Sequence, residues 1–118
     1  MFNSELMKKL SDCFGPSGRE NTIREMIAEE VKAYADEISI DPLGNLTARK
    51  KGTGKKILFS AHMDQIGIII THVDEKGFLR FANVGGLNAK ELLGLRMVFD
   101  NGLEGVICQE ELKDKEKI

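Results

Sequence analysis

The chain has 118 residues, of which 42% are hydrophobic and 31% are charged, and its formal net charge at pH 7 is −2. This length suits one ordinary domain with its own hydrophobic core. The slightly negative charge gives no reason to expect binding to nucleic acid or to an anionic membrane surface. The longest apolar run, residues 66–70, is far shorter than the roughly 20 residues that span a bilayer.

The chain contains two cysteines, Cys13 and Cys108, and they lack the spacing of zinc ligands or of a redox pair. We expect two buried free thiols in a reducing cytosol rather than a disulfide. The amino-terminal residues also lack the basic-then-apolar order of a signal peptide. Both observations favour a cytoplasmic protein.

Two amphipathic helices are predicted in the first third of the chain. Apolar residues recur at helical spacing over residues 4–14, and a Gly-Pro pair ends that helix. Ser17 and Glu20 then have the spacing of a capping box, in which each side chain accepts a hydrogen bond from the other residue's amide. A second, longer helix is predicted to continue to about Tyr34, because apolar residues again line one face.

After the second helix the pattern changes to strands separated by turns. Two short strands are predicted on either side of a turn at residues 41–45, and a buried strand is predicted at 56–61. Residues 66–73 are apolar and rich in β-branched side chains, which predicts a fully buried strand. A turn at residues 74–77 should lead from it into a further strand.

Beyond residue 84, glycines separate short strands. Asp100-Asn101-Gly102 lies between two apolar segments, 97–99 and 106–108, and favours a hairpin because Asn and Gly tolerate positive φ. Seven of the last ten residues are charged, and none of the ten is a Gly or Pro that would end a helix or strand. This ending indicates an interruption in a longer protein.

His62 and Asp64 form the most unusual feature of the sequence, because they lie within its most apolar stretch, FSAHMDQIGIII. Burying such a pair is costly unless each group is paired or bound. On a strand, residues two apart share a face, and ligand sites of open α/β sheets lie at the carboxyl ends of strands. An aspartate can fix the tautomer of a histidine and leave its other nitrogen for a metal. A core histidine satisfied by one carboxylate is the alternative, and the H-x-D spacing alone does not decide between them.

The surrounding motifs resemble a known family. FGPSGRE at residues 14–20, DPLGNL at 41–46, AHMDQIG at 61–67, and G-F-L-x-F with VGG at 77–86 occur in order. They resemble the amino-terminal part of the tetrahedral aminopeptidases, the glutamyl and deblocking aminopeptidase family of dinuclear metallopeptidases, whose members are often labelled cellulase or endoglucanase.

This resemblance implies an α/β fold in two parts. Residues 1–72 would be the amino-terminal part of the metallopeptidase catalytic domain, with two helices and a mixed sheet. Residues 73–118 would be the first strands of a small inserted β-barrel domain. In the family this barrel drives oligomerisation, so the complete protein is expected to be a homo-oligomer, from dimer to dodecamer.

The resemblance also implies site residues, cofactors and substrates. His62 matches the family's first metal-binding histidine, and Asp64 matches the catalytic aspartate that orients it. Two divalent ions, zinc or cobalt, would activate water for hydrolysis of amino-terminal residues from peptides. The second histidine, His72, matches no family ligand.

The family's remaining ligands have no counterpart in this chain. They are a bridging aspartate, an adjacent glutamate pair, a further acidic ligand and a final histidine. Since a catalytic zinc normally has about three protein ligands, we expect the 118-residue chain alone to be inactive. The alternative is a non-catalytic interaction module, or a degraded-gene product, derived from that family.

Overall fold

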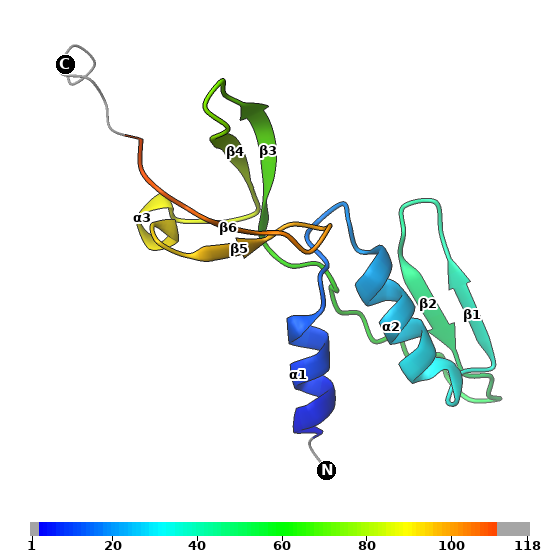
Figure 1. Ribbon diagram of the computed structural model, residues 1–118. Coiled ribbons are helices and arrows are strands. Elements are labelled where there is room, and N and C mark those ends of the chain that lie inside the picture. Colours follow the sequence, from blue (N-terminus) through cyan, green and yellow to red (C-terminus); the bar gives the residue numbers. More distant parts are fainter. Residues whose placement is uncertain (1–2, 111–118) are drawn as a thin grey trace. The chain divides into compact units, whose positions relative to one another are not determined.

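The computed structural model describes residues 3–110, which form three helices and six strands (Figure 1). They belong to two compact units, of which the first ends at Gly85 and the second begins at Gly86. Within this described part, the strands pair as three separate two-stranded antiparallel sheets. Helices and strands are both present as expected, but the mixed sheet expected in the first part is not formed by residues 3–110. The domain division between residues 72 and 73 stays a prediction.

Both predicted helices are present, with shorter bounds than expected. Helix α1 spans Ser4–Asp12 and begins after Asn3, whose side chain accepts a hydrogen bond of 3.0 Å from a main-chain amide of the first turn. Helix α2 spans Asn21–Lys32. Lys9 of α1 and Glu30 of α2 form an ion pair of 2.7 Å between the two helices. Because both side chains are largely solvent-exposed, this pair contributes little stability.

The predicted capping box at the start of α2 does not form. Glu20 is the N-cap residue and makes no side-chain capping bond; its carboxylate instead accepts from the Gly18 amide at 2.6 Å. The Ser17 amide, which the Glu20 carboxylate was expected to bind, donates to the Gln65 carbonyl at 3.2 Å. A long-range contact has therefore replaced the local one.

Strands β1 (Glu37–Ile40) and β2 (Leu46–Arg49) form an antiparallel hairpin beside α2 (Figure 1). Its turn depends on Asp41, whose carboxylate accepts from two main-chain amides of the turn, each at 2.9 Å. Gly44 has φ of +89°, a conformation that glycine adopts without a Cβ clash. The turn predicted at residues 41–45 is confirmed.

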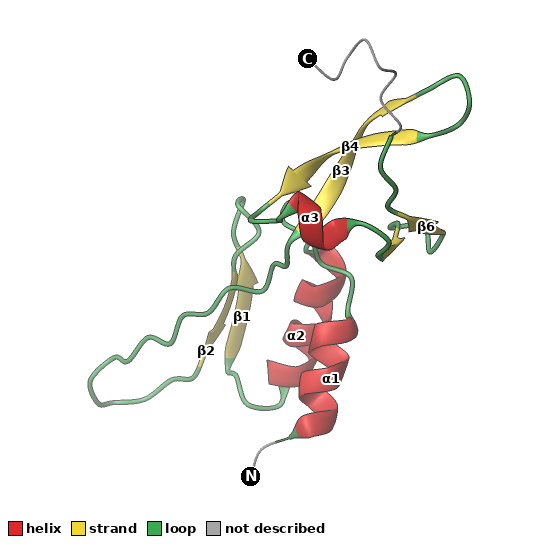
Figure 2. Ribbon diagram, turned by 90° about the vertical axis from the view of Figure 1, so that its left-hand side faces the viewer, coloured by secondary structure: helices red, strands yellow, loops and turns green. Residues whose placement is uncertain are grey.

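Strands β3 (Gly67–Val73) and β4 (Leu79–Val84) form a second antiparallel hairpin (Figure 2). Asp74 supports its turn in the same way, accepting from two main-chain amides at 2.9 and 2.8 Å. The prediction of a fully buried strand is wrong, because no residue of β3 is buried and Ile69 is 58% exposed. In the described part β3 has one partner strand, so its apolar side chains remain partly in solvent.

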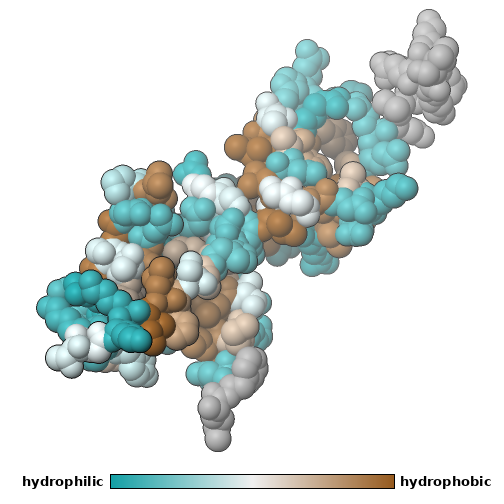
Figure 3. Space-filling view, turned by 180° about the vertical axis from the view of Figure 1, so that it is seen from behind, coloured by the Kyte–Doolittle hydropathy of each residue, from teal (hydrophilic) through white to brown (hydrophobic). Residues whose placement is uncertain are grey.

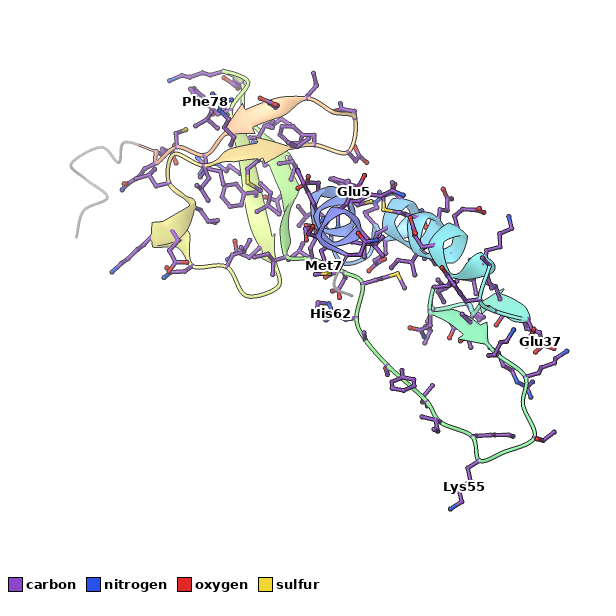
Figure 4. All side chains as sticks on the ribbon, turned by 90° about the horizontal axis from the view of Figure 1, so that it is seen from below. Glu5, Met7, Glu37, Lys55, His62 and Phe78 are labelled. Carbon is purple, nitrogen blue, oxygen red and sulfur yellow. The ribbon has the colours of Figure 1, made fainter. Side chains whose placement is uncertain are left out.

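No strand forms over residues 56–61, where a buried strand was predicted. The side chains of Ile57, Leu58 and Phe59 are 78%, 87% and 91% exposed. Figure 4 shows this stretch, between the labelled Lys55 and His62, as part of an open loop. A strand needs partners for its amides and carbonyls, and residues 3–110 supply none here. Without that strand, no mixed sheet can join the hairpins.

The hydrophobic core is small. In the first unit only Cys13 and Ile23, among apolar residues described, are buried, at 7% and 5% exposure. Hydrophobic side chains accordingly appear as brown areas on the surface drawn in Figure 3. Ile23 packs closely on the main chain of Gly15: a methyl group at Gly15 would lie 2.7 Å from Ile23 Cγ2. Ile23 thus anchors the segment between the two helices.

The second unit contains a short helix and the predicted hairpin. Helix α3 (Ala89–Leu92) precedes strands β5 (Arg96–Val98) and β6 (Glu104–Val106), which pair antiparallel. The Asn101 side chain accepts from a main-chain amide at 3.0 Å, and Gly102 has φ of +81°. The hairpin is confirmed, with its strands one or two residues earlier than predicted.

Both thiols are free, as expected, but only Cys13 is buried. Cys108 lies two residues beyond β6 and is exposed, so the expectation of a buried thiol there is wrong. Within residues 3–110, no helix combines the length and the apolar character needed to cross a membrane.

Truncating the buried side chain of α2 tests the role of this small core. We expect Ile23→Ala to lower the free energy of unfolding by about 2–4 kcal/mol, through lost burial and the cavity left behind. Ile40→Ala is the control, since Ile40 is 53% exposed, and should cost less than about 1 kcal/mol. Urea unfolding measures both. Equal losses in the two variants would contradict Ile23 as the anchor.

The β1–β2 hairpin should weaken in acid. Hydrogen bonds from the Lys51 amide and the Lys50 ammonium lower the pKa of Asp36, and hydrogen bonds from the Asn45 side chain and amide lower the pKa of Asp41. Both carboxylates therefore stabilise the folded hairpin above their ordinary pKa of 3.8, and that contribution is lost as the pH falls through the lowered values.

Amide hydrogen exchange across β1 and β2, followed during acid titration, measures this loss. Asp36→Asn and Asp41→Asn together keep the side-chain shape and remove both titrating groups. The double variant should show a weaker dependence of hairpin protection on pH. An unchanged acid transition would show that other groups control the hairpin.

Candidate functional site

His62 and Asp64 contact each other, as their spacing predicted. His62 Nδ1 lies 2.9 Å from Asp64 Oδ1 and 2.9 Å from the Asp64 carbonyl oxygen. A carboxylate and a carbonyl can only accept, so the hydrogen on the neutral ring is assigned to Nδ1 and donates to Asp64. The lone pair then lies on Nε2, which makes that nitrogen the one able to bind a metal.

The pair is not buried. The side chain of His62 is 85% exposed and that of Asp64 is 40% exposed. The expectation of a polar pair enclosed by apolar residues is therefore wrong, because the preceding residues 56–61 do not join a sheet. The alternative of a core histidine fails for the same reason. Hydrogen bonds, rather than packing, hold the imidazole.

Ser17 completes this arrangement from the other end of the unit. Its Oγ donates to Asp64 Oδ2 at 2.5 Å, a length typical of a hydroxyl on a charged carboxylate. This bond, followed by the one from His62, lowers the pKa of the Asp64 carboxyl. The aspartate is thus bound at both oxygens, by Ser17 at Oδ2 and by His62 at Oδ1.

A short paired segment brings Ser17 to Asp64. Pro16 and Gln65 form a parallel bridge, in which the Gln65 amide donates to the Gly15 carbonyl at 3.0 Å and the Ser17 amide to the Gln65 carbonyl at 3.2 Å. The Gln65 side chain adds a bond of 2.7 Å to the Cys13 carbonyl. We call residues 13–17 the site loop. Gln65 therefore fixes this loop immediately beside Asp64.

Sequence reasoning found His62 and Asp64 but missed Ser17 and Gln65. Ser17 was assigned to a helix cap because a Glu lies three residues later, which is a local signal. Its actual partner lies 47 residues away. Only the motif FGPSGRE, through its family resemblance, connected this segment with the H-x-D residues, and it assigned Ser17 no role.

The donor set suits part of a metal centre. The Nε2 of His62 faces away from its carboxylate partner and is available as a ligand. Among residues 3–110, however, no group of three or more His, Cys, Asp or Glu side chains could hold a metal ion. His72 lies on β3 opposite Arg80, outside the hydrogen-bonded set around Asp64. The described residues therefore fit one ligand position of a metal site, and not a whole one.

Gly67 should be essential for the site loop. A methyl group there would lie 2.8 Å from Pro16 Cβ, too close for both to keep their places. We expect Gly67→Ala to destabilise the first unit by about 1–3 kcal/mol and to weaken exchange protection of the Gln65 amide. Gly52→Ala is the matched control, because nothing lies within 4 Å of its added methyl. Full protection of Gln65 in the Gly67 variant would contradict this packing.

Comparisons with known proteins agree with the resemblance. The "Putative aminopeptidase" of Acetivibrio thermocellus is 51% identical over 107 residues, covering 91% of this chain and 32% of that protein. Lysyl aminopeptidase of Pyrococcus furiosus is 40% identical over 100 residues, covering 84% of this chain and 29% of that protein. This chain therefore spans about a third of the length of the curated relatives it matches.

Solved structures give the same relationship. A TET aminopeptidase from a marine sediment archaeon of the Thaumarchaeota superimposes with a TM-score of 0.85 at 35% identity, over 98% of this chain and 35% of that one. An endoglucanase of Thermotoga maritima superimposes with a TM-score of 0.79 at 36% identity, over 88% of this chain and 34% of that one. The α/β fold is thus confirmed. One solved member also carries the endoglucanase name that the resemblance led us to expect. The sequence profile of the M42 glutamyl aminopeptidase family matches residues 44–116, and the chain belongs to this family.

Proposed function

We propose that this chain is part of a metal-dependent aminopeptidase that removes amino-terminal residues from peptides. The observation that carries the proposal is the hydrogen bond of 2.9 Å between His62 Nδ1 and Asp64 Oδ1, which leaves Nε2 as a ligand in a family that generally depends on metals. His62 is the metal ligand, and Asp64 orients its ring. The ions are zinc or cobalt.

The bound metal would lower the pKa of a water molecule and stabilise the oxyanion formed on the peptide carbonyl. Asp64 contributes indirectly. Its negative charge keeps the hydrogen on Nδ1 and raises the basicity of Nε2, which makes Nε2 a stronger metal ligand. A single imidazole is too few ligands for a catalytic ion. We therefore propose that further ligands must come from outside residues 3–110, and that the 118-residue chain does not hydrolyse peptides by itself.

Assembly belongs to the same proposal. The Pyrococcus horikoshii TET1 peptidase, which is 38% identical and superimposes with a TM-score of 0.79 over 98% of this chain, can assemble into a tetrahedron or a large octahedral shell. By analogy, the complete protein would be a cytoplasmic homo-oligomer, with residues 73–118 as the beginning of an oligomerisation barrel.

A chimera tests the proposed function. This chain replaces the matched segment of Pyrococcus furiosus lysyl aminopeptidase, and hydrolysis of lysyl p-nitroanilide is measured with added Zn²⁺ or Co²⁺. We expect an active, chelator-sensitive enzyme. Asp64→Asn should lower kcat/KM by about 10–100-fold, and His62→Ala should lower it further through loss of a ligand.

Ser39→Ala, on the exposed strand β1, is the control and should leave activity unchanged. The isolated 118-residue chain, assayed in parallel, should show no chelator-sensitive turnover. If the folded, metal-loaded chimera were inactive, or if His62→Ala kept full activity, the enzymatic role would be refuted. An interaction module would then explain the exposed apolar residues 57–59 better.

A further inference from the structure

Ser17 has a hydroxyl group that the local structure of its segment does not use. It lies between α1 and α2, but the N-cap of α2 is Glu20, and no side chain caps that helix. The Ser17 hydroxyl instead donates to Asp64 Oδ2 at 2.5 Å. This contact joins two segments 47 residues apart, so the local backbone cannot account for it.

The hydrogen bonds form a continuous line from Ser17 to the imidazole. Ser17 Oγ donates to Asp64 Oδ2, and His62 Nδ1 donates to Asp64 Oδ1 at 2.9 Å. A carboxylate bound at one oxygen can still rotate about its terminal torsion, which is broad and roughly two-fold. Binding at the second oxygen restricts that rotation and fixes the direction in which Oδ1 accepts.

His62 depends on this restriction because its only other hydrogen-bond partner among residues 3–110 is the Asp64 carbonyl oxygen, 2.9 Å from Nδ1. Its side chain is 85% exposed, and the residues immediately before it form no strand. Ser17, in contrast, is held firmly. Its own amide donates to the Gln65 carbonyl at 3.2 Å, and its neighbour Pro16 packs where Gly67 leaves space. Ser17 therefore lies on a segment tied down by main-chain bonds, whereas His62 lies on an exposed segment outside any strand.

We propose that Ser17 is a positioning residue that acts through Asp64 to hold His62 in the Nδ1–H tautomer, with Nε2 free to bind metal. The catalytic significance of this role rests on the proposed function; the orientation itself does not. The effect of Ser17 on His62 is transmitted by the Asp64 carboxylate, which both residues contact.

Nuclear magnetic resonance of the 118-residue chain tests the orientation without any metal or substrate. Long-range ¹H–¹⁵N spectra report the tautomer of each ring at a pH well above the ordinary histidine pKa of about 6.5. The chain has two histidines, so His72 serves as the internal reference. We expect His62 to be predominantly the Nδ1–H tautomer.

Ser17→Ala should lower the ratio of Nδ1–H to Nε2–H in His62 by roughly two- to tenfold, the effect of losing one hydrogen bond. Ser17→Thr keeps the hydroxyl and should restore the ratio, and Ser39→Ala should not change it. Asp64→Ala gives the value for a ring whose Nδ1 keeps only the main-chain carbonyl of residue 64 as acceptor. Backbone amide spectra of each variant show whether the first unit remains folded.

An unchanged His62 ratio in folded Ser17→Ala would overturn the positioning role, and so would a Thr variant that behaves like Ala in a folded chain. If Ser17→Ala unfolds the unit, Ser17→Cys replaces it, because a thiol of similar size is a much weaker donor; an unchanged His62 ratio in that folded variant would overturn the role in the same way. In the chimera, Ser17→Ala should lower kcat while Ser17→Thr preserves it.

The two proposals can fail separately. A chimera that is active and requires His62, combined with an unchanged tautomer ratio, would leave the enzymatic function intact and refute the role of Ser17. A changed ratio with an inactive, metal-loaded chimera would support the role of Ser17 in orienting the ring and refute the enzymatic function.

Discussion

The pairing of Gln65 with the site loop is the constraint on which the first unit depends. Three hydrogen bonds, two between main-chain atoms and one from the glutamine side chain, join residues 13–17 to the residue after Asp64. Ile23 supports this loop from α2 by packing on Gly15, and Gly67 leaves room for Pro16. Helices from the start of the chain and the hairpin β3–β4 therefore meet at one point, and the polar residues of the site lie there.

Contacts between residues a few positions apart could be predicted from the sequence, whereas contacts between residues far apart in the chain could not. Asp41, Asp74 and Asn101 support turns with hydrogen bonds to amides two to four residues away, so their effect is contained in a short window of sequence. The contact of His62 with Asp64 is equally local. Ser17 was misassigned because a correct local pattern competed with a partner 47 residues away. The strand at residues 56–61 was predicted because the segment is apolar, and it does not form. An apolar composition shows that a segment is suited to burial, but it does not show which residues would cover it.

The exposed side chains have a physical cost that matters for any isolated form of this chain. Ile57, Leu58 and Phe59 present a continuous apolar segment whose main-chain groups find no partner among residues 3–110. Such a segment is a template for pairing with another chain. Relatives about three times as long offer many more residues that could cover it. The first unit is thus better understood as part of a larger folded surface than as a self-sufficient core.

The long reach of the Ser17–Asp64 contact also orders the events of folding. Closing a loop of 47 residues costs about 3.4 kcal/mol of chain entropy beyond a constant term, whereas closing a turn of four residues costs only about 1.2 kcal/mol. The hairpin turns can therefore close early, and the site loop docks later, once the helices and β3 are in place. The contact of His62 with Asp64 spans two residues and can form before that docking, so the last bond to form at the site is the one that holds the second carboxylate oxygen.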